Sequence, residues 1–217
     1  MELGYWKIKG AGHPLRMLLA HEKVEFKNTL YDTPESWFGK KETMGFDFPN
    51  LPYLIDGDVK ITETSAIPQY IAFKLNKPEL TGKPGFDKIK YLEIVGVIKD
   101  ILDNLGKIFY AAEGHEKIYD DQKDRFFYGK SEKLEKFLGD KEFLLGYFTY
   151  ADILLANTFA TLDTVSIKLA KPSTFEKYPK LKAHAERVFN IPTIKAFLAS
   201  EEGQLPALPP HYNKLGL

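Results

Sequence analysis

The chain of 217 residues contains no cysteine. A protein without cysteine cannot form disulfide bonds, bind metal through thiolates or use a catalytic cysteine of its own. Any thiol chemistry at this protein must therefore use a sulfur atom that a ligand supplies. The five histidines show no metal-ligand spacing, so we expect neither a metal site nor a cofactor.

Net charge and long apolar runs are lacking as well. Thirty basic residues balance thirty acidic ones, so no overall field attracts nucleic acid or an anionic membrane, and we expect a small-molecule partner. No stretch approaches the roughly 18 apolar residues of a membrane-spanning helix, and the N-terminal segment has no signal-peptide pattern. We therefore expect a folded cytoplasmic protein that binds neither nucleic acid nor membrane.

The sequence does contain two distinct patterns, of which the first predicts a mixed α+β domain over residues 1–76. Alternating apolar positions indicate strands, three- and four-residue spacing indicates helices, and Asp56-Gly57 is typical of a hairpin turn. The expected order βαβαββα describes a four-stranded mixed sheet. We expect strands over 3–8 and 25–31, helices over 13–22, 35–42 and 64–75, and a hairpin within 47–62.

The second pattern is helical throughout. The segment NKPELTGKPG, with two prolines and two glycines, indicates a linker over residues 77–84. Beyond it, apolar residues recur at helical steps, as in a long helix that carries Ile94, Ile98, Ile101, Leu105 and Ile108. We therefore expect an all-α C-terminal domain over residues 85–217. Within it, Thr149–Asp152 is typical of the capping box that begins a buried helix.

Three segments carry a family resemblance: GYWKIKG (4–10), HPLRMLL (13–19) and GFDFPNLPYLIDGDVKIT (45–62). They resemble the cytosolic glutathione transferases of the tyrosine type, and are most similar to the mu class. The resemblance is dense over residues 3–75 and continues through the helical part. It implies a thioredoxin-like N-terminal domain that binds glutathione as co-substrate, a helical domain that contributes the electrophile site, and a homodimer.

The resemblance identifies Tyr5 as the residue that activates the thiol of glutathione. A thiol with a pKa of about 8.5 is only a few per cent ionised at neutral pH, so a hydrogen-bond donor to the thiolate is needed. The residues add independent support, because Tyr5 is the only side chain before Thr29 that carries a hydroxyl or thiol. The alternative is a tyrosine that only packs in the sheet. Arg16, on the helix that follows, is interpreted as structural.

The resemblance also assigns donors to the glycyl end of glutathione. An indole N–H, an ammonium and an amide are suitable donors for its carboxylate, and the matching residues are Trp6, Trp37, Lys41 and Asn50. Trp37 is expected to serve there because an otherwise exposed indole needs a reason. For Lys41 the alternative is a side chain that only faces solvent.

For the cysteinyl residue of glutathione, the resemblance implies a cis Leu51-Pro52 peptide. It directs the Leu51 backbone toward that residue, which would pair with it in the manner of an added strand. Glu63 and Thr64 precede a helix, where a helix N-terminus and a hydroxyl can receive the γ-glutamyl carboxylate. The Glu63 carboxylate also suits the ligand's ammonium group. The alternatives are a simple turn proline and an acidic residue that only stabilises the helix.

The remaining assignments concern the electrophile and the second subunit. Asp100 is expected to reach glutathione bound in the partner subunit, with Asp103 as a competitor and a solvated helix face as the alternative. Ala11 and Tyr110 are expected in the electrophile pocket, where Tyr110 could donate a proton; core packing is its alternative. Phe48 is expected to anchor the dimer interface, and the tail over residues 211–217 to line or border the electrophile site.

Three functions remain open at this level. The first is a glutathione S-transferase that conjugates the thiolate to hydrophobic electrophiles. The second is a glutathione-dependent isomerase or peroxidase, similar to a prostaglandin D synthase, and the third is a non-catalytic binding or structural protein on the same fold.

Overall fold

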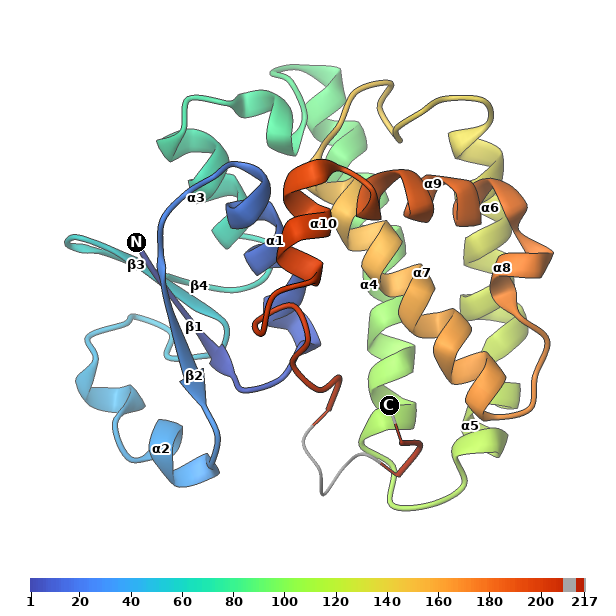
Figure 1. Ribbon diagram of the computed structural model, residues 1–217, viewed down its shortest axis with the longest axis horizontal. Helices are drawn as coiled ribbons and strands as arrows, with labels where there is room; N and C mark the ends of the chain where they lie inside the picture. The colour runs from blue at the N-terminus through green and yellow to red at the C-terminus, as the bar shows by residue number, and fades with distance from the viewer. Residues whose placement is uncertain (209–213, 217) are drawn as a thin grey trace. The chain divides into compact units, whose positions relative to one another are not determined.

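The computed structural model describes residues 1–208 and 214–216 (Figure 1). Internal contacts divide the chain into two compact units, the first of which comprises Met1–Pro78 together with residues 192–208. The second comprises Glu79–Ile191 and the described end of the chain. Within the described residues, no helix is both long and apolar enough to cross a bilayer.

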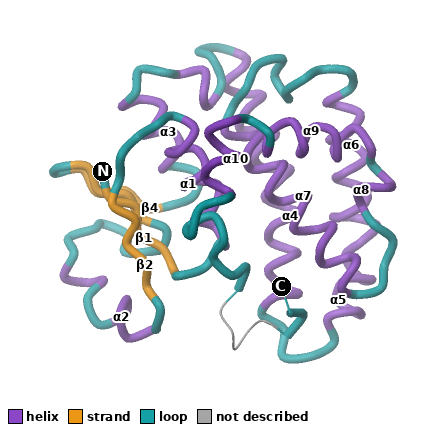
Figure 2. The backbone as a smooth tube through the Cα atoms, in the orientation of Figure 1, coloured by secondary structure: helices purple, strands orange, loops and turns teal. Residues whose placement is uncertain are grey.

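The first unit is built on a sheet, whose strands are orange in Figure 2. Its four strands have the order β2-β1-β3-β4. Its strands are β1 (Glu2–Trp6), β2 (Lys27–Tyr31), β3 (Tyr53–Asp56) and β4 (Val59–Thr62). The β1–β2 pair is parallel and the other two pairs are antiparallel. The predicted four-stranded mixed sheet is therefore confirmed, and Gly57 forms the hairpin turn with the positive φ of 62° that favours glycine.

The helices of this unit differ from the predicted ones at some of their ends. They are α1 (His13–His21), α2 (Pro34–Phe38), α3 (Ile67–Lys74) and α10 (Pro192–Leu198). The prediction that a helix reaches residue 42 is wrong, because α2 gives way to a separate 3₁₀ turn at Lys41–Thr43. The predicted start at residue 64 is also wrong, since α3 begins at Ile67, which puts Pro68 in its first turn.

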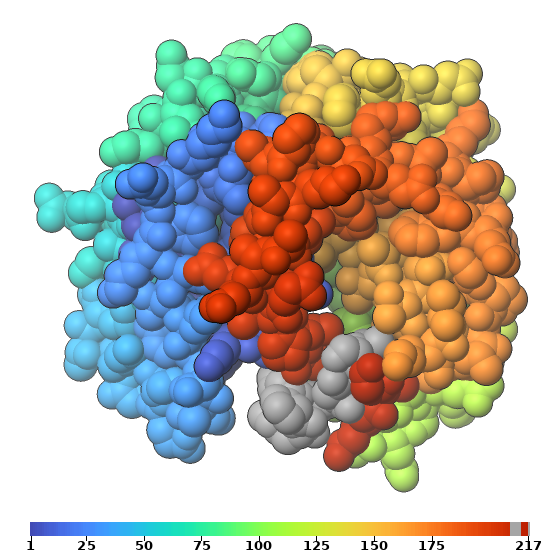
Figure 3. Space-filling view, in the orientation of Figure 1, coloured from blue at the N-terminus to red at the C-terminus, as the bar shows by residue number. Residues whose placement is uncertain are grey.

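The segment over residues 192–208 returns to the first unit. Helix α10 contacts α1, and the His21 ring lies 3.1 Å from the Thr193 hydroxyl. The Lys9 amide donates a hydrogen bond to the Pro206 carbonyl at 2.7 Å. In the space-filling view this orange-red segment lies on the near face, beside the blue residues of the N-terminus (Figure 3). The domain limits expected from the sequence, 1–76, 77–84 and 85–217, stay a prediction.

The second unit is helical over its described residues, as predicted. Helix α7 (Tyr150–Lys168) is buried along most of its length and contacts α4 (Phe86–Phe109) and α9 (Pro179–Phe189). Its N-cap is Thr149, and Asp152, three residues later, completes a capping box, which confirms that prediction. The other elements are a 3₁₀ helix (Pro78–Thr81), α5 (His115–Gln122), a π-helical segment (Lys123–Tyr128), α6 (Gly129–Leu138) and α8 (Thr174–Lys177).

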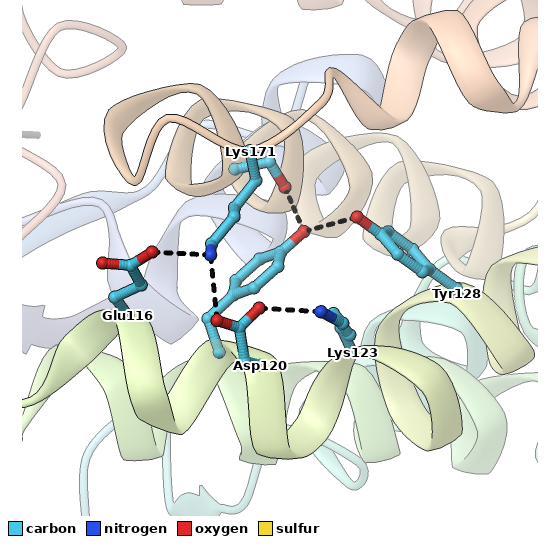
Figure 4. A network of polar contacts seen from close by, with 7 residues as sticks. Glu116, Asp120, Lys123, Tyr128 and Lys171 are labelled. Carbon is cyan, nitrogen blue, oxygen red and sulfur yellow. Dashed lines mark hydrogen bonds and ion pairs between the residues drawn. The ribbon is translucent and has the colours of Figure 1, made fainter.

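A polar network ties α5 and the π-helical segment to the residues that follow α7 (Figure 4). The Lys171 ammonium lies 2.7 Å from Glu116 and 2.9 Å from Asp120, and Asp120 also pairs with Lys123 at 2.9 Å. These ion pairs raise the pKa of Lys171 and lower that of Asp120. Because exposed ion pairs contribute little individually, we expect only a small effect of each pair on stability.

Candidate functional site

Tyr5 lies near the end of β1, where the chain turns into α1. Its side chain is buried, with 7% of its surface exposed, and its hydroxyl accepts a hydrogen bond of 3.1 Å from the Ala11 amide. That amide belongs to the 3₁₀ turn Gly10–Gly12, which directly precedes α1. The strand and the turn thus bring the hydroxyl to the start of α1, in the place that the sequence predicts for a thiol activator.

Two glycines allow the turn to approach the Tyr5 ring. A Cβ atom built on Gly12 would lie 2.7 Å from Cδ1 of Tyr5, and one built on Gly10 would lie 2.8 Å from its hydroxyl oxygen. Both distances are shorter than any carbon side chain tolerates. Sequence reasoning did not identify these two residues as part of the site, although a pair of glycines after a strand is a signal of close backbone approach.

His13 follows this turn and is also buried, with 3% of its surface exposed. Burial, together with the charges of Lys9 and Arg16, lowers the pKa of His13 to about 3, so its imidazole is neutral at physiological pH. Its ring packs against Phe197, at 5.5 Å between ring centroids, and its Nδ1 atom has no hydrogen-bond partner among the described residues. His13 is the first residue of α1, so a helix end lies buried at this point of the first unit.

A second group of candidate residues meets at the start of β3 and the end of β4. The Asn50 side chain accepts a hydrogen bond from the Leu51 amide at 2.9 Å and donates one to the Glu63 carboxylate at 3.1 Å. The Leu51–Pro52 peptide is cis, as predicted. Three polar groups expected to bind the ligand are therefore neighbours in space.

Glu63 has an unusual backbone conformation. Its φ is +77°, a value that costs free energy for a residue with a side chain and that is concentrated at functional positions. The Glu63 carbonyl accepts hydrogen bonds from the amides of Ala66 and Ile67, so the chain turns tightly through Thr64 before α3 begins. On the other side of Glu63 in the chain, the Thr62 hydroxyl donates a hydrogen bond of 2.9 Å to the Phe48 carbonyl.

The candidates for the glycyl end lie around an aromatic cluster. Trp37 is buried, with 3% of its surface exposed, and stacks on Tyr53 at 5.9 Å between ring centroids. The argument that Trp37 is an otherwise exposed indole is therefore wrong, because the cluster of Tyr31, Phe46 and Tyr53 accounts for its burial. Trp6 is partly buried and packs edge-on against Tyr31.

Lys41 is half-buried, not fully solvated. Its ammonium lies 3.3 Å from the Glu42 carboxylate and 5.5 Å from the ring centroid of Phe38. Phe38 is 58% exposed and also packs against Trp6. An exposed aromatic ring beside an indole and an ammonium is a surface feature that the sequence reasoning missed.

In the second unit, Asp100 forms an ion pair with Lys130 at 2.6 Å, whereas its competitor Asp103 pairs with Lys99 at 2.7 Å. Tyr110 follows the end of α4 and is 60% exposed, which excludes the alternative of core packing. In the first unit, the Phe48 ring is 77% exposed, as a protruding anchor requires. His211 and Tyr212 of the C-terminal tail lie outside the described residues.

Comparison with known proteins matches both parts of the chain. The model of the glutathione S-transferase N-terminal domain matches residues 1–73, and that of the C-terminal domain matches residues 99–201. A class-mu 26 kDa glutathione S-transferase of Fasciola hepatica (isozyme 51) is 34% identical over 93% of this chain and 89% of its own length. The class-mu 26 kDa isozyme of Schistosoma japonicum is 35% identical over 92% and 88%, respectively.

Solved structures agree with the sequence comparison. The crystal structure of the glutathione S-transferase Blo t 8 superposes with a TM-score of 0.82 and 30% identity, over 97% of both chains. The two domain models, the two class-mu relatives and the Blo t 8 structure all indicate the same family. The chain belongs to the glutathione S-transferase family.

Proposed function

We propose that this protein conjugates the thiolate of glutathione to hydrophobic electrophiles, with the Tyr5 hydroxyl as the donor that stabilises the thiolate. The main observation in support is the position of Tyr5, whose ring is buried and whose hydroxyl is held at the start of α1 by a hydrogen bond from the Ala11 amide. Because that amide already donates to the hydroxyl oxygen, the hydroxyl proton is directed to another acceptor. A thiolate is the acceptor that the family chemistry supplies.

The energetics fit one donor. Lowering the pKa of a thiol by about 2 units corresponds to about 2.7 kcal/mol. A hydrogen bond to a charged group contributes about 1.5–3 kcal/mol, so a single well-placed phenol supplies most of the shift. The sulfur comes from glutathione, in keeping with a chain that has no cysteine.

The binding assignments follow the groups described above. We propose that the Leu51 backbone pairs with the cysteinyl residue, and that Glu63 and Thr64 receive the γ-glutamyl end. The Asn50 side chain already donates a hydrogen bond to the Glu63 carboxylate. Glu63 therefore presents this carboxylate in a fixed direction toward an ammonium group. Trp6, Trp37, Lys41 and Asn50 remain the proposed residues for the glycyl end, although Trp37 can contribute only from within the aromatic cluster.

A homodimer of the cytoplasm completes the proposal. Phe48 would anchor the partner subunit through its exposed ring, and Asp100 would reach the glutathione bound there. Asp100 would have to exchange its present partner Lys130 for the ligand's ammonium group. Tyr110 and Ala11 are proposed for the electrophile pocket, in which the exposed Tyr110 hydroxyl could protonate the product of an epoxide opening.

The test is a steady-state assay of the wild type and Tyr5→Phe with glutathione and a chloronitrobenzene. We expect Tyr5→Phe to lower kcat/KM by about 10- to 150-fold, the equivalent of 1.5–3 kcal/mol, while glutathione affinity changes by no more than a few-fold. Unchanged turnover would remove Tyr5 from the mechanism. Product analysis separates the alternatives, because a transferase consumes glutathione whereas an isomerase returns it.

A further inference from the structure

A buried arginine lies against the Tyr5 ring. Arg16 has no exposed surface, and its guanidinium carbon lies 5.8 Å from the centroid of the Tyr5 ring. It donates to the Ile8 carbonyl at 2.9 Å, to the Trp6 carbonyl at 3.4 Å and to the Asn28 side chain at 3.1 Å. All of these acceptors are neutral, and no ion-pair partner of Arg16 is found in the part of the chain that the structure describes.

The charge of Arg16 persists despite its burial. Burial lowers the pKa of the Arg16 guanidinium to about 10, with the neighbouring Glu202 and Tyr5 side chains acting in the opposite direction, so the group is protonated at pH 7. The other titratable groups around it are His13, which is neutral there, and Lys9, whose positive charge adds to that of Arg16 at His13. A single buried cation thus faces the ring of the proposed thiol activator.

A cation in a region of low dielectric constant acts over several ångströms. Positive potential at a phenol stabilises negative charge that develops on it, which makes the hydroxyl more acidic and a stronger donor to an anion. The same potential directly stabilises a negative sulfur that accepts from that hydroxyl. A fully hydrogen-bonded guanidinium also cannot move away when charge develops, so the field is fixed in advance.

We propose that Arg16 is a positioning residue for thiolate formation, whose buried positive charge strengthens Tyr5 as a hydrogen-bond donor and holds the strand end that presents it. The proposal rests on the proposed function, since it concerns the same bound thiolate. It goes beyond a purely structural role, because it requires the charge of Arg16 and not only its hydrogen bonds.

Asn28 offers a way to separate the charge from the hydrogen bonds. Its Oδ1 atom accepts from Arg16, whereas its Nδ2 atom is buried and has no hydrogen-bond partner among the described residues. Asn28→Asp has the same shape, keeps the acceptor, removes the unpaired donor and places a negative charge beside the guanidinium. The fold therefore keeps its contacts while the positive potential at Tyr5 falls.

The measurement is the apparent pKa of bound glutathione, followed by the ultraviolet absorbance of its thiolate, together with thermal unfolding. In Asn28→Asp we expect unfolding to occur at the same or a higher temperature, while the pKa of the bound thiol rises by about 0.5–1 unit, which reduces the thiolate fraction at low pH by about 3- to 10-fold. Asn28→Leu, which removes the acceptor without adding a charge, is the matched control and should leave that pKa within about 0.3 unit of the wild type.

Arg16→Lys and Arg16→Met supply the direct comparison. Both variants lose hydrogen bonds, but only Arg16→Met loses the charge, so it alone should raise the pKa of the bound thiol by about 0.5–1 unit. Equal values in the wild type, Asn28→Asp and Arg16→Met would overturn the proposal. If the wild type itself shows no thiolate below the pKa of free glutathione, the proposed function fails first, which is a distinguishable result.

Discussion

The close contact between Gly12 and Tyr5 yields a prediction that depends on the structure alone. In Gly12→Ala the new methyl group would lie 2.7 Å from Cδ1 and 2.8 Å from Cγ of Tyr5. These atoms form the root of the ring and cannot swing away as the end of a flexible side chain would. The φ of Gly12 is −77°, so alanine fits the backbone and the effect comes from the contact only.

The expected magnitude has two parts. Forcing one methyl group into a packed position costs about 1–3 kcal/mol of stability. If the ring moves enough to lose its hydrogen bond to the thiolate, kcat/KM falls by up to the factor expected for Tyr5→Phe, about 10- to 150-fold. The matched control is Gly96→Ala on α4, where no atom lies within 4 Å of the new methyl group and helix propensity adds about 0.5–1 kcal/mol.

The assay is a double-mutant cycle on kcat/KM with unfolding measured in parallel. Because Tyr5→Phe already lacks the hydroxyl, adding Gly12→Ala to it should lower stability again but reduce kcat/KM little further. Wild-type activity in Gly12→Ala, or a full additional loss in the double mutant, would refute the reasoning that Gly12 acts by positioning the Tyr5 hydroxyl.

Two further predictions concern stability. His13 binds a proton with a pKa of about 3 when folded and about 6.5 when unfolded, so protonation favours unfolding and stability falls as the pH drops from 6.5 toward 3. This linkage amounts to about 2 kcal/mol between pH 7 and pH 5, and His13→Gln should lose that part of the pH dependence in urea unfolding. In the second unit, Asp152→Ala should lower the free energy of unfolding by about 3–5 kcal/mol, measured by thermal unfolding. The reason is that the fully buried Asp152 carboxylate forms hydrogen bonds with the Leu144 amide, with the amide and hydroxyl of Thr149 and with the His184 ring. Asp152→Asn is its control, with a smaller cost because one acceptor oxygen remains. An unchanged pH slope in His13→Gln, or a loss below about 1 kcal/mol in Asp152→Ala, would contradict these two arguments.

Much of the fold was readable from the chain because local signals agreed with one another. Alternation over β1, the Asp56-Gly57 turn and the spacing of apolar residues on α4 each depend on neighbours in the sequence, and each was predicted correctly in type. Boundaries were less secure. The expected start of α3 was three residues early, because an acidic residue and a threonine are typical of a helix start while the actual turn uses the positive φ of Glu63.

The candidate site divides in the same way. The absence of any other hydroxyl or thiol before Thr29 singled out Tyr5, and the family resemblance gave the positions of Leu51-Pro52, Glu63 and Thr64. The premise that the Trp37 indole is otherwise exposed was wrong, because its burial depends on rings from β2, β3 and the loop before β3, which converge only after folding.

By itself, then, the sequence determined the chemistry that the protein can offer: no thiol of its own, one early phenol, and a sheet followed by helices. Only the tertiary structure decided how that phenol is held, with two glycines that leave room for its ring. It also decided that Arg16 is a buried charge beside this ring, without an ion-pair partner among the described residues. The physical reason is that burial, close contact and electrostatic potential depend on which distant segments meet. Local sequence patterns carry no direct record of those meetings.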